Sequence, residues 1–171
     1  NKTAFLSLFQ NLFVRNWPRV VRSINFQDTG DCADISPDGQ LIVTVSGDKT
    51  ARVWDVTSGK SVPLNPGNDI RFAVFSPDGR WVGTTSWDKT ARVWDAALGK
   101  PVGEPLRHEF EVYCAIFSPD GRWLVTTSAD NATRIWEVST GKMIGEPMRH
   151  DGNVYSAAFS KDGQWVATTS D

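Results

Sequence analysis

Three residues in the second half of the chain have the side chains of a Ser-His-Asp triad. His108 is followed by Ser128 and Asp130. In such a triad the histidine takes the proton of the serine hydroxyl and the aspartate orients the ring, which would give acyl transfer. A hydrolase serine, however, often lies in a Gly-x-Ser-x-Gly turn that exposes its hydroxyl, and the residues around Ser128 lack that pattern. A structural role for these residues therefore has to be weighed against the catalytic one.

A second stretch that could have a chemical role runs from Asp34 to Gly39. It contains two aspartates and faintly suggests a calcium-binding loop. Its twelfth position is Val45, where such a loop needs a bidentate glutamate. In later copies of the same stretch the residue matching Asp34 is apolar: Val74, Ile116 and Ala158. The run therefore predicts a tight turn. No glycine-rich phosphate loop is present, and we expect neither a metal nor a cofactor.

Composition and charge exclude other classes of partner. The formal net charge is −2 and basic residues form no block, so nucleic acid and anionic membranes are poor partners. Cys32 and Cys114 are too few for a disulfide framework and are expected to be buried thiols. The apolar segment 4–14 is shorter than the roughly 20 residues of a membrane span. These observations favour a cytoplasmic location.

The elements that must position these side chains recur along the chain. Ser-Pro-Asp-Gly, or Ser-Lys-Asp-Gly in the last copy, places its aspartate at positions 38, 78, 120 and 162. In the first three copies a tryptophan followed by an acid comes sixteen residues later, at Trp54, Trp94 and Trp136. A repeat of about 42 residues predicts a chain built from copies of one small unit.

Each unit is predicted to contain four short strands. In the third unit these are 112–117, 123–127, 133–136 and 143–148, separated by turns rich in Gly, Asp and Asn. Strands this short cannot bury a face alone, so the units must stack on one another. Four strands per repeat with a Trp-Asp ending is the pattern of a β-propeller blade. The fold class is therefore all-β.

With these motifs in register, the chain resembles the WD40-repeat family over residues 20–171. The phrases at 103–108 and 145–150, Gly-Glu-Pro-Leu/Met-Arg-His, resemble its bacterial branch, in which near-identical repeats often follow a signalling domain. The resemblance implies blades at about 31–64, 70–106 and 112–148, with an incomplete one at 153–171. Residues 1–19 are expected to be a linker or short helix from an upstream region, and 20–24 a last strand of an earlier blade.

The resemblance also implies a structural reading of the triad-like residues. WD40 blades join a loop histidine, a Ser or Thr, an Asp and the Trp by hydrogen bonds, which satisfies buried polar groups. In the third unit these are His108, Ser128, Asp130 and Trp136, and His150 takes the loop position in the fourth. The first and second units have Phe26 and Pro66 in place of the histidine, but keep the remaining members: Ser46, Asp48, Trp54, Ser86, Asp88 and Trp94.

In WD40 proteins partners usually bind the face that carries the loop before each blade and the turn between its second and third strands. Three alignment columns lie there: Asp31, Arg71, Tyr113 and Tyr155; Thr29, Asp69, Glu111 and Asn153; and Gly47, Trp87 and Ala129. Trp87 stands out because its counterparts are small, so the fold does not require an indole. Exposed Trp, Tyr and Arg have the composition of a binding hot spot.

These patterns predict a non-catalytic interaction scaffold or sensor module within a larger, bacterial signalling protein. Three and a half blades leave open edges, so we expect either a piece of a longer propeller or a homo-oligomer that closes a ring. An enzyme on a propeller frame is a further alternative, but it would need catalytic acids or histidines repeated along the channel. The identity of the partner does not follow from the sequence.

Overall fold

A computed structural model describes residues 30–46, 50–64 and 69–171. The described residues form fourteen β-strands and no helix, so no helix among them could cross a membrane. Several parts of the sequence-based prediction lie outside the described residues. They are the helix in 1–19, the strand at 20–24, and the residues Phe26, Thr29, Gly47, Asp48 and Pro66. The all-β prediction is confirmed for the described chain.

Three sheets have four antiparallel strands each, in sequential order, and a fourth sheet has two. We call them blades 1 to 4. Blade 1 contains β1 (Gly30–Ile35), β2 (Leu41–Ser46), β3 (Ala51–Asp55) and β4 (Ser61–Leu64). Blade 2 contains β5 (Ile70–Phe75), β6 (Trp81–Ser86), β7 (Thr90–Asp95) and β8 (Pro101–Arg107). Blade 3 contains β9 (Val112–Phe117), β10 (Trp123–Ser128), β11 (Ala132–Glu137) and β12 (Met143–Arg149), and blade 4 contains β13 (Val154–Phe159) and β14 (Val166–Ser170).

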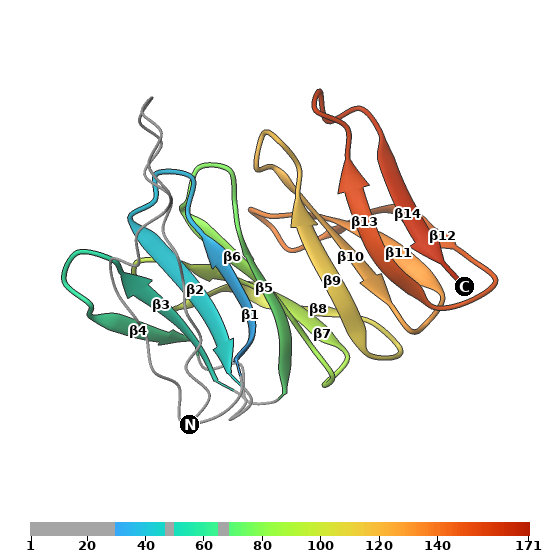
Figure 1. Ribbon diagram of the computed structural model, residues 1–171. Helices are drawn as coiled ribbons and strands as arrows, with labels where there is room; N and C mark the ends of the chain where they lie inside the picture. Colours follow the sequence, from blue (N-terminus) through green and yellow to red (C-terminus); the bar gives the residue numbers. More distant parts are fainter. Residues whose placement is uncertain (1–29, 47–49, 65–68) are drawn as a thin grey trace, which may run out of the picture.

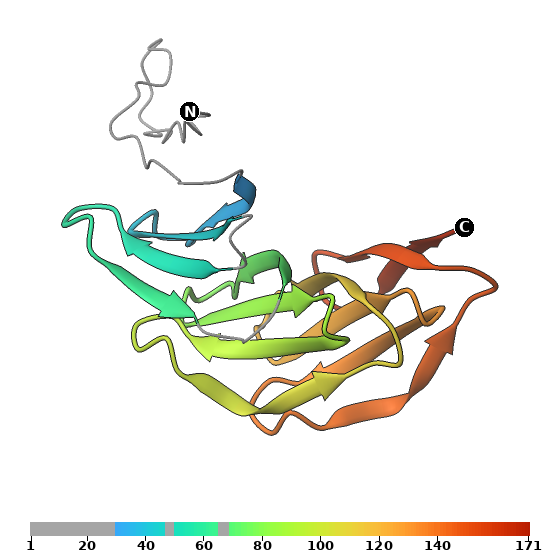
Figure 2. The same cartoon turned by 90° about the horizontal axis from the view of Figure 1, so that it is seen from below.

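The blades lie side by side around one curved edge (Figures 1 and 2). The first strand of each blade contacts the first strand of the next, so β1, β5, β9 and β13 form the inner edge. The later strands of each blade lie progressively further out (Figure 2). The turns of all blades therefore lie on two opposite faces of the row of blades, at the ends of the strands. Each of these faces can form a surface from several repeats.

The turn that opens each second strand has the same hydrogen bonds in every blade. In blade 3 the Ser118 hydroxyl donates to Asp120 Oδ1 at 2.5 Å, and the Trp123 N–H donates to Ser118 Oγ at 2.9 Å. Gly121 adopts φ of 70°, which favours glycine. In the first copy, Asp34 accepts backbone N–H groups of Ile35 and Phe75. These carboxylates are therefore occupied by backbone and side-chain donors, as expected for a turn.

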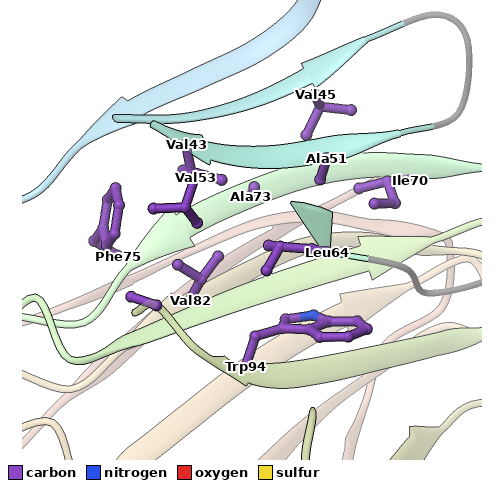
Figure 3. Packing of buried hydrophobic residues seen from close by; sticks show 11 residues of the cluster. Val43, Val45, Ala51, Val53, Leu64, Ile70, Ala73, Phe75, Val82 and Trp94 are labelled. Atoms are coloured by element: carbon purple, nitrogen blue, oxygen red, sulfur yellow. The ribbon is translucent and has the colours of Figure 1, made fainter. Parts of the chain in front are cut away.

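The core lies between blades. One cluster joins blades 1 and 2, and Figure 3 shows Val43 and Val53 facing Phe75 and Val82 across this junction. A second cluster joins blades 2 and 3, with Trp81 packed against it. At roughly 25 cal/mol per Å² of buried apolar surface, these junctions are the main source of stability in a stacked architecture.

Candidate functional site

Every described pair of the blade tryptophan and the central threonine is hydrogen bonded. The indole N–H of Trp136 donates to Thr126 Oγ1 at 2.8 Å. Trp94 donates to Thr84 at 2.8 Å, and Trp54 donates to Thr44 at 2.9 Å. The threonine lies on the second strand and the tryptophan on the third, so this bond ties two strands of each blade together.

In blade 3 the same bond continues into a buried polar chain. His108 Nε2 lies 2.7 Å from Thr126 Oγ1, and His108 Nδ1 lies 3.2 Å from Asp130 Oδ2. Since the Trp136 indole donates to Thr126, the threonine hydroxyl proton is free to be donated to Nε2. Nδ1, on the other side of the ring, faces the Asp130 carboxylate. One chain of polar contacts thus runs from Trp136 through Thr126 and His108 to Asp130.

Ser128 does not lie in this chain, contrary to the sequence-based assignment. Its hydroxyl donates to the Phe110 carbonyl at 3.2 Å and accepts the Asp130 N–H at 3.1 Å. Thr126 takes the place assigned to Ser128. The two residues share a face of β10, but Trp136 is paired with Leu124, so its indole reaches the nearer hydroxyl. Ser128 makes no bond to His108, and the serine–histidine contact of a catalytic triad is therefore missing.

Arg134 is a further member of the cluster that sequence reasoning missed. Its Nη1 donates to Asp130 Oδ2 at 2.6 Å and also contacts His108 Nδ1. The Glu109 N–H donates to the same carboxylate oxygen at 2.9 Å. Asp130 and Arg134 are four residues apart, a spacing that brings side chains together on a helix. In a segment of strands the same spacing does not predict a contact.

These surroundings change the protonation of both partners. Burial, helped by the Arg134 charge, lowers the pKa of His108 to about 4 against the opposing effect of Asp130. Burial raises the pKa of Asp130, but the Glu109 N–H, Arg134 and His108 outweigh it, so the pKa falls below its usual value. At neutral pH the cluster holds a neutral imidazole, a carboxylate and a guanidinium.

The other network positions form shorter chains. In blade 2, Ser86 accepts the Asp88 N–H at 3.0 Å, and Asp88 accepts from the Thr90 hydroxyl at 2.6 Å. In blade 4, His150 Nε2 lies 3.2 Å from Thr168 Oγ1. Ser46 is buried. Throughout the described ranges, no group of three His, Cys, Asp or Glu side chains could hold a metal ion.

The turn between the second and third strands carries the predicted partner surface. The backbone N–H of Trp87 donates to the Asp69 carbonyl, and that of Ala129 donates to the Glu111 carbonyl. The corresponding bond in blade 4 joins Asp171 to Asn153. Two of the three alignment columns are thus adjacent in space in each of these blades.

Large side chains project from this surface. Trp87 is 51% exposed, and the Arg71 guanidinium lies 5.4 Å from its ring centroid. Tyr113 and Tyr155 stack with centroids 5.2 Å apart. Burial, and to a smaller extent Tyr155 and Glu111, raise the pKa of Tyr113 against the opposing effect of the Arg71 charge. We use the name aromatic face for the predicted partner-binding residues, which are Trp87, Arg71, Tyr113, Tyr155, Asp69, Glu111 and Asn153.

Sequence reasoning missed one aromatic residue that lies close to this face. Phe110 is half exposed, and the Lys89 ammonium lies 5.1 Å from its ring centroid. Lys89 adopts a left-handed φ of 70° in the turn after Trp87. A phenylalanine in the loop that follows His108 has no counterpart in the alignment columns, so repeat comparison could not identify it.

Comparison with known proteins gave one family. A model described as WD domain, G-beta repeat matches residues 19–55, 61–95, 99–137 and 141–171. The second and third matches begin at the outer strand of one blade and end at the third strand of the next. A repeat therefore spans the junction between two blades and links them covalently. No curated protein matched the chain.

Proposed function

This chain belongs to the WD40-repeat family, and on that premise we propose that it is a non-catalytic scaffold that binds other proteins or peptides through its aromatic face. WD40 repeats generally mediate interactions between proteins. The observation that carries the proposal is Trp87, which is half exposed at a turn whose counterpart in blade 3 is Ala129. Burial of an exposed indole beside Arg71 is the kind of contact that dominates binding energy.

The wider setting that we propose is a sensor or scaffold region of a larger bacterial signalling protein in the cytoplasm. It is supported by the near-identical phrases at 103–108 and 145–150. Sequencing the complete gene in the source organism tests this setting, because a fused signalling domain would support it and an isolated enzyme domain would oppose it.

Replacing Trp87 and Tyr113 together by alanine is expected to weaken binding of a captured partner at least tenfold. Loss of a central aromatic anchor typically costs about 2 kcal/mol or more, and 1.4 kcal/mol corresponds to tenfold. The partner is first isolated from a lysate of the source organism, and its affinity is then measured with purified chains.

Trp165 supplies the matched control, since it is 73% exposed but lies in the turn directly before β14, which corresponds to the turn before β6 and not to the turn that carries Trp87. Trp165→Ala should bind the partner as the wild type does. Unchanged affinity of the double variant would show that the aromatic face is not the binding surface.

A second candidate function is self-association through the outer surface of blade 3. The turn before the last strand of a blade packs on the outer strand of the preceding blade. Before β8, Gly99 lies so close to β4 of blade 1 that an added Cβ would be 2.6 Å from the Pro63 carbonyl oxygen, and before β12, Gly141 faces Leu106 of β8. On β8, Leu106 is 3% exposed, whereas the equivalent Met148 on β12 is 38% exposed. Ile144 is also exposed, so self-association of the 171-residue chain through β12 would cover an apolar strip.

Sedimentation of the purified chain across a hundredfold range of concentration tests self-association. If it occurs through β12, the mean mass should rise with concentration, and Met148→Glu with Ile144→Glu should abolish the rise because both charges would be buried in the contact. A monomer mass at every concentration would rule this candidate out.

A further inference from the structure

A cavity of about 250 Å³ lies between blades 2 and 3, where β6 begins and β11 ends. Trp81 and Trp87 are at opposite ends of β6 and its turn, so the cavity opens far from the aromatic face. Its walls include Arg80 and Trp81 from blade 2 and Arg122 and Val138 from blade 3. Both blades have all four strands, so the cavity belongs to a complete junction.

Two of the side chains that line the cavity are cationic. The Arg80 guanidinium lies 4.3 Å from the Trp81 ring centroid, and that of Arg122 lies 5.1 Å from the Trp123 ring centroid. Neither guanidinium makes a side-chain hydrogen bond or ion pair with the described residues. Stacking holds each planar group in place and leaves its N–H donors available at the edge.

Two carboxylates, Asp120 and Glu137, also line the cavity, but both have partners in their own turns. Asp120 accepts the Ser118 hydroxyl and the Arg122 N–H, and these bonds, chiefly the first, lower its pKa. Glu137 accepts the Thr140 hydroxyl at 2.7 Å. The charges of Arg122 and Arg80 also lower the pKa of Asp120 and of Asp78, so an incoming anion competes with these carboxylates for guanidinium groups that no hydrogen bond from the described residues holds.

The pairing of Arg with Trp is confined to these two blades. The same two columns hold Gln40 and Leu41 in blade 1, and Gln164 and Trp165 in blade 4. The blade fold therefore tolerates a neutral amide where Arg80 and Arg122 stand. Nothing in the turn geometry requires a guanidinium, since the backbone N–H of Gln40 and of Arg80 donates to the preceding aspartate in the same way.

We propose that this cavity is a binding site for a small oxyanion, a phosphate or carboxylate group, held by the N–H donors of Arg80 and Arg122. Guanidinium groups match such oxygens in geometry and charge. The volume is below the range of about 300–1,000 Å³ typical of drug-sized ligands, so the site fits a single anionic group on a short stem. Trp81 and Val138 provide an apolar wall for that stem.

The test uses the 171-residue chain and inorganic phosphate. At constant ionic strength, the indole N–H signals of Trp81 and Trp123 should shift on titration and saturate, while that of Trp87 should not move. The signals are assigned with single Trp→Phe variants. Binding is expected with a dissociation constant on the order of millimolar, as for one small anion in a partly open site.

The variant R80Q/R122Q should bind phosphate at least tenfold more weakly, because both donor groups are lost. The double variant places glutamine at the position where blades 1 and 4 already have it, so it should fold. If the double variant does not fold, R80Q alone is tested. Parallel titrations with glutarate decide which oxyanion the site favours. Equal responses in wild type and variant, or no saturable shift with either anion, would overturn the proposal.

Discussion

Replacing Asp130 by alanine is expected to lower the free energy of unfolding by about 3–5 kcal/mol, the cost of removing one partner from a buried ion pair. The Asp130 side chain is 2% exposed and that of Arg134 is 9% exposed. The variant would leave the guanidinium buried beside His108 with no countercharge. It would also remove the acceptor for the Glu109 N–H, which fixes the loop entering the blade. Urea unfolding followed by tryptophan fluorescence measures the loss.

Asp88, the equivalent residue of blade 2, gives the matched control. Its carboxylate lies 3.9 Å from Arg92, and both side chains are more exposed than the pair in blade 3. Asp88→Ala should therefore cost about 1 kcal/mol, the value of ordinary hydrogen bonds. The double variant D130A/R134A should recover part of the loss of D130A, because no uncompensated charge stays buried. If D130A costs no more than D88A, the buried pair is not the main determinant of blade 3 stability.

The second expected result is a loss of stability in mildly acidic solution that depends on His108. The pKa of His108 in the folded protein is about 4, below the usual value of 6.5. Between these two values the unfolded chain takes up a proton that the folded protein excludes. The contribution is therefore fully present above pH 6.5 and is lost as the pH falls toward 4. Between pH 6.5 and pH 5 the loss is about 2 kcal/mol, at 1.36 kcal/mol for each pH unit.

Urea unfolding of the wild type and of His108→Gln at pH 7 and pH 5 isolates this contribution. The variant lacks the buried imidazole, so its stability should fall by about 2 kcal/mol less than that of the wild type over the same range. His150→Gln leaves His108 in place and should follow the wild type. Asp130 causes a separate loss of stability at pH values below its ordinary pKa, because its pKa in the folded protein is also lowered. Parallel pH dependence of wild type and His108→Gln would contradict the assignment.

Much of the fold followed from the order of residues along the chain. Ser118, Asp120 and Gly121 form their turn from bonds within six residues, so the motif predicts the turn wherever it occurs. The spacing to Trp136 then sets the length of the second and third strands, and stacking of similar units follows because one such sheet cannot bury its own face. The aromatic face was predicted for a related reason: positions equivalent in the repeats lie at equivalent ends of the blades.

The site was harder to predict because contacts across strands depend on register. Thr126 and Ser128 both point to the same face of β10, and a pattern of alternating residues cannot choose between them. Only the pairing of Trp136 with Leu124 selects Thr126. Arg134 enters the cluster for a similar reason, since its side chain crosses the turn that brings Asp130 beside His108.

The sequence by itself therefore determined the blade, its turns and the end at which the residues of the aromatic face gather, because these depend on local hydrogen bonds and on a repeated period. The tertiary structure alone decided which hydroxyl bonds to His108, where Phe110 meets Lys89, and that Arg80 and Arg122 line one cavity. Each of these involves residues of different strands or blades. Their distances are set by strand register and by the packing of one blade on the next, and neither can be read from spacing along the chain.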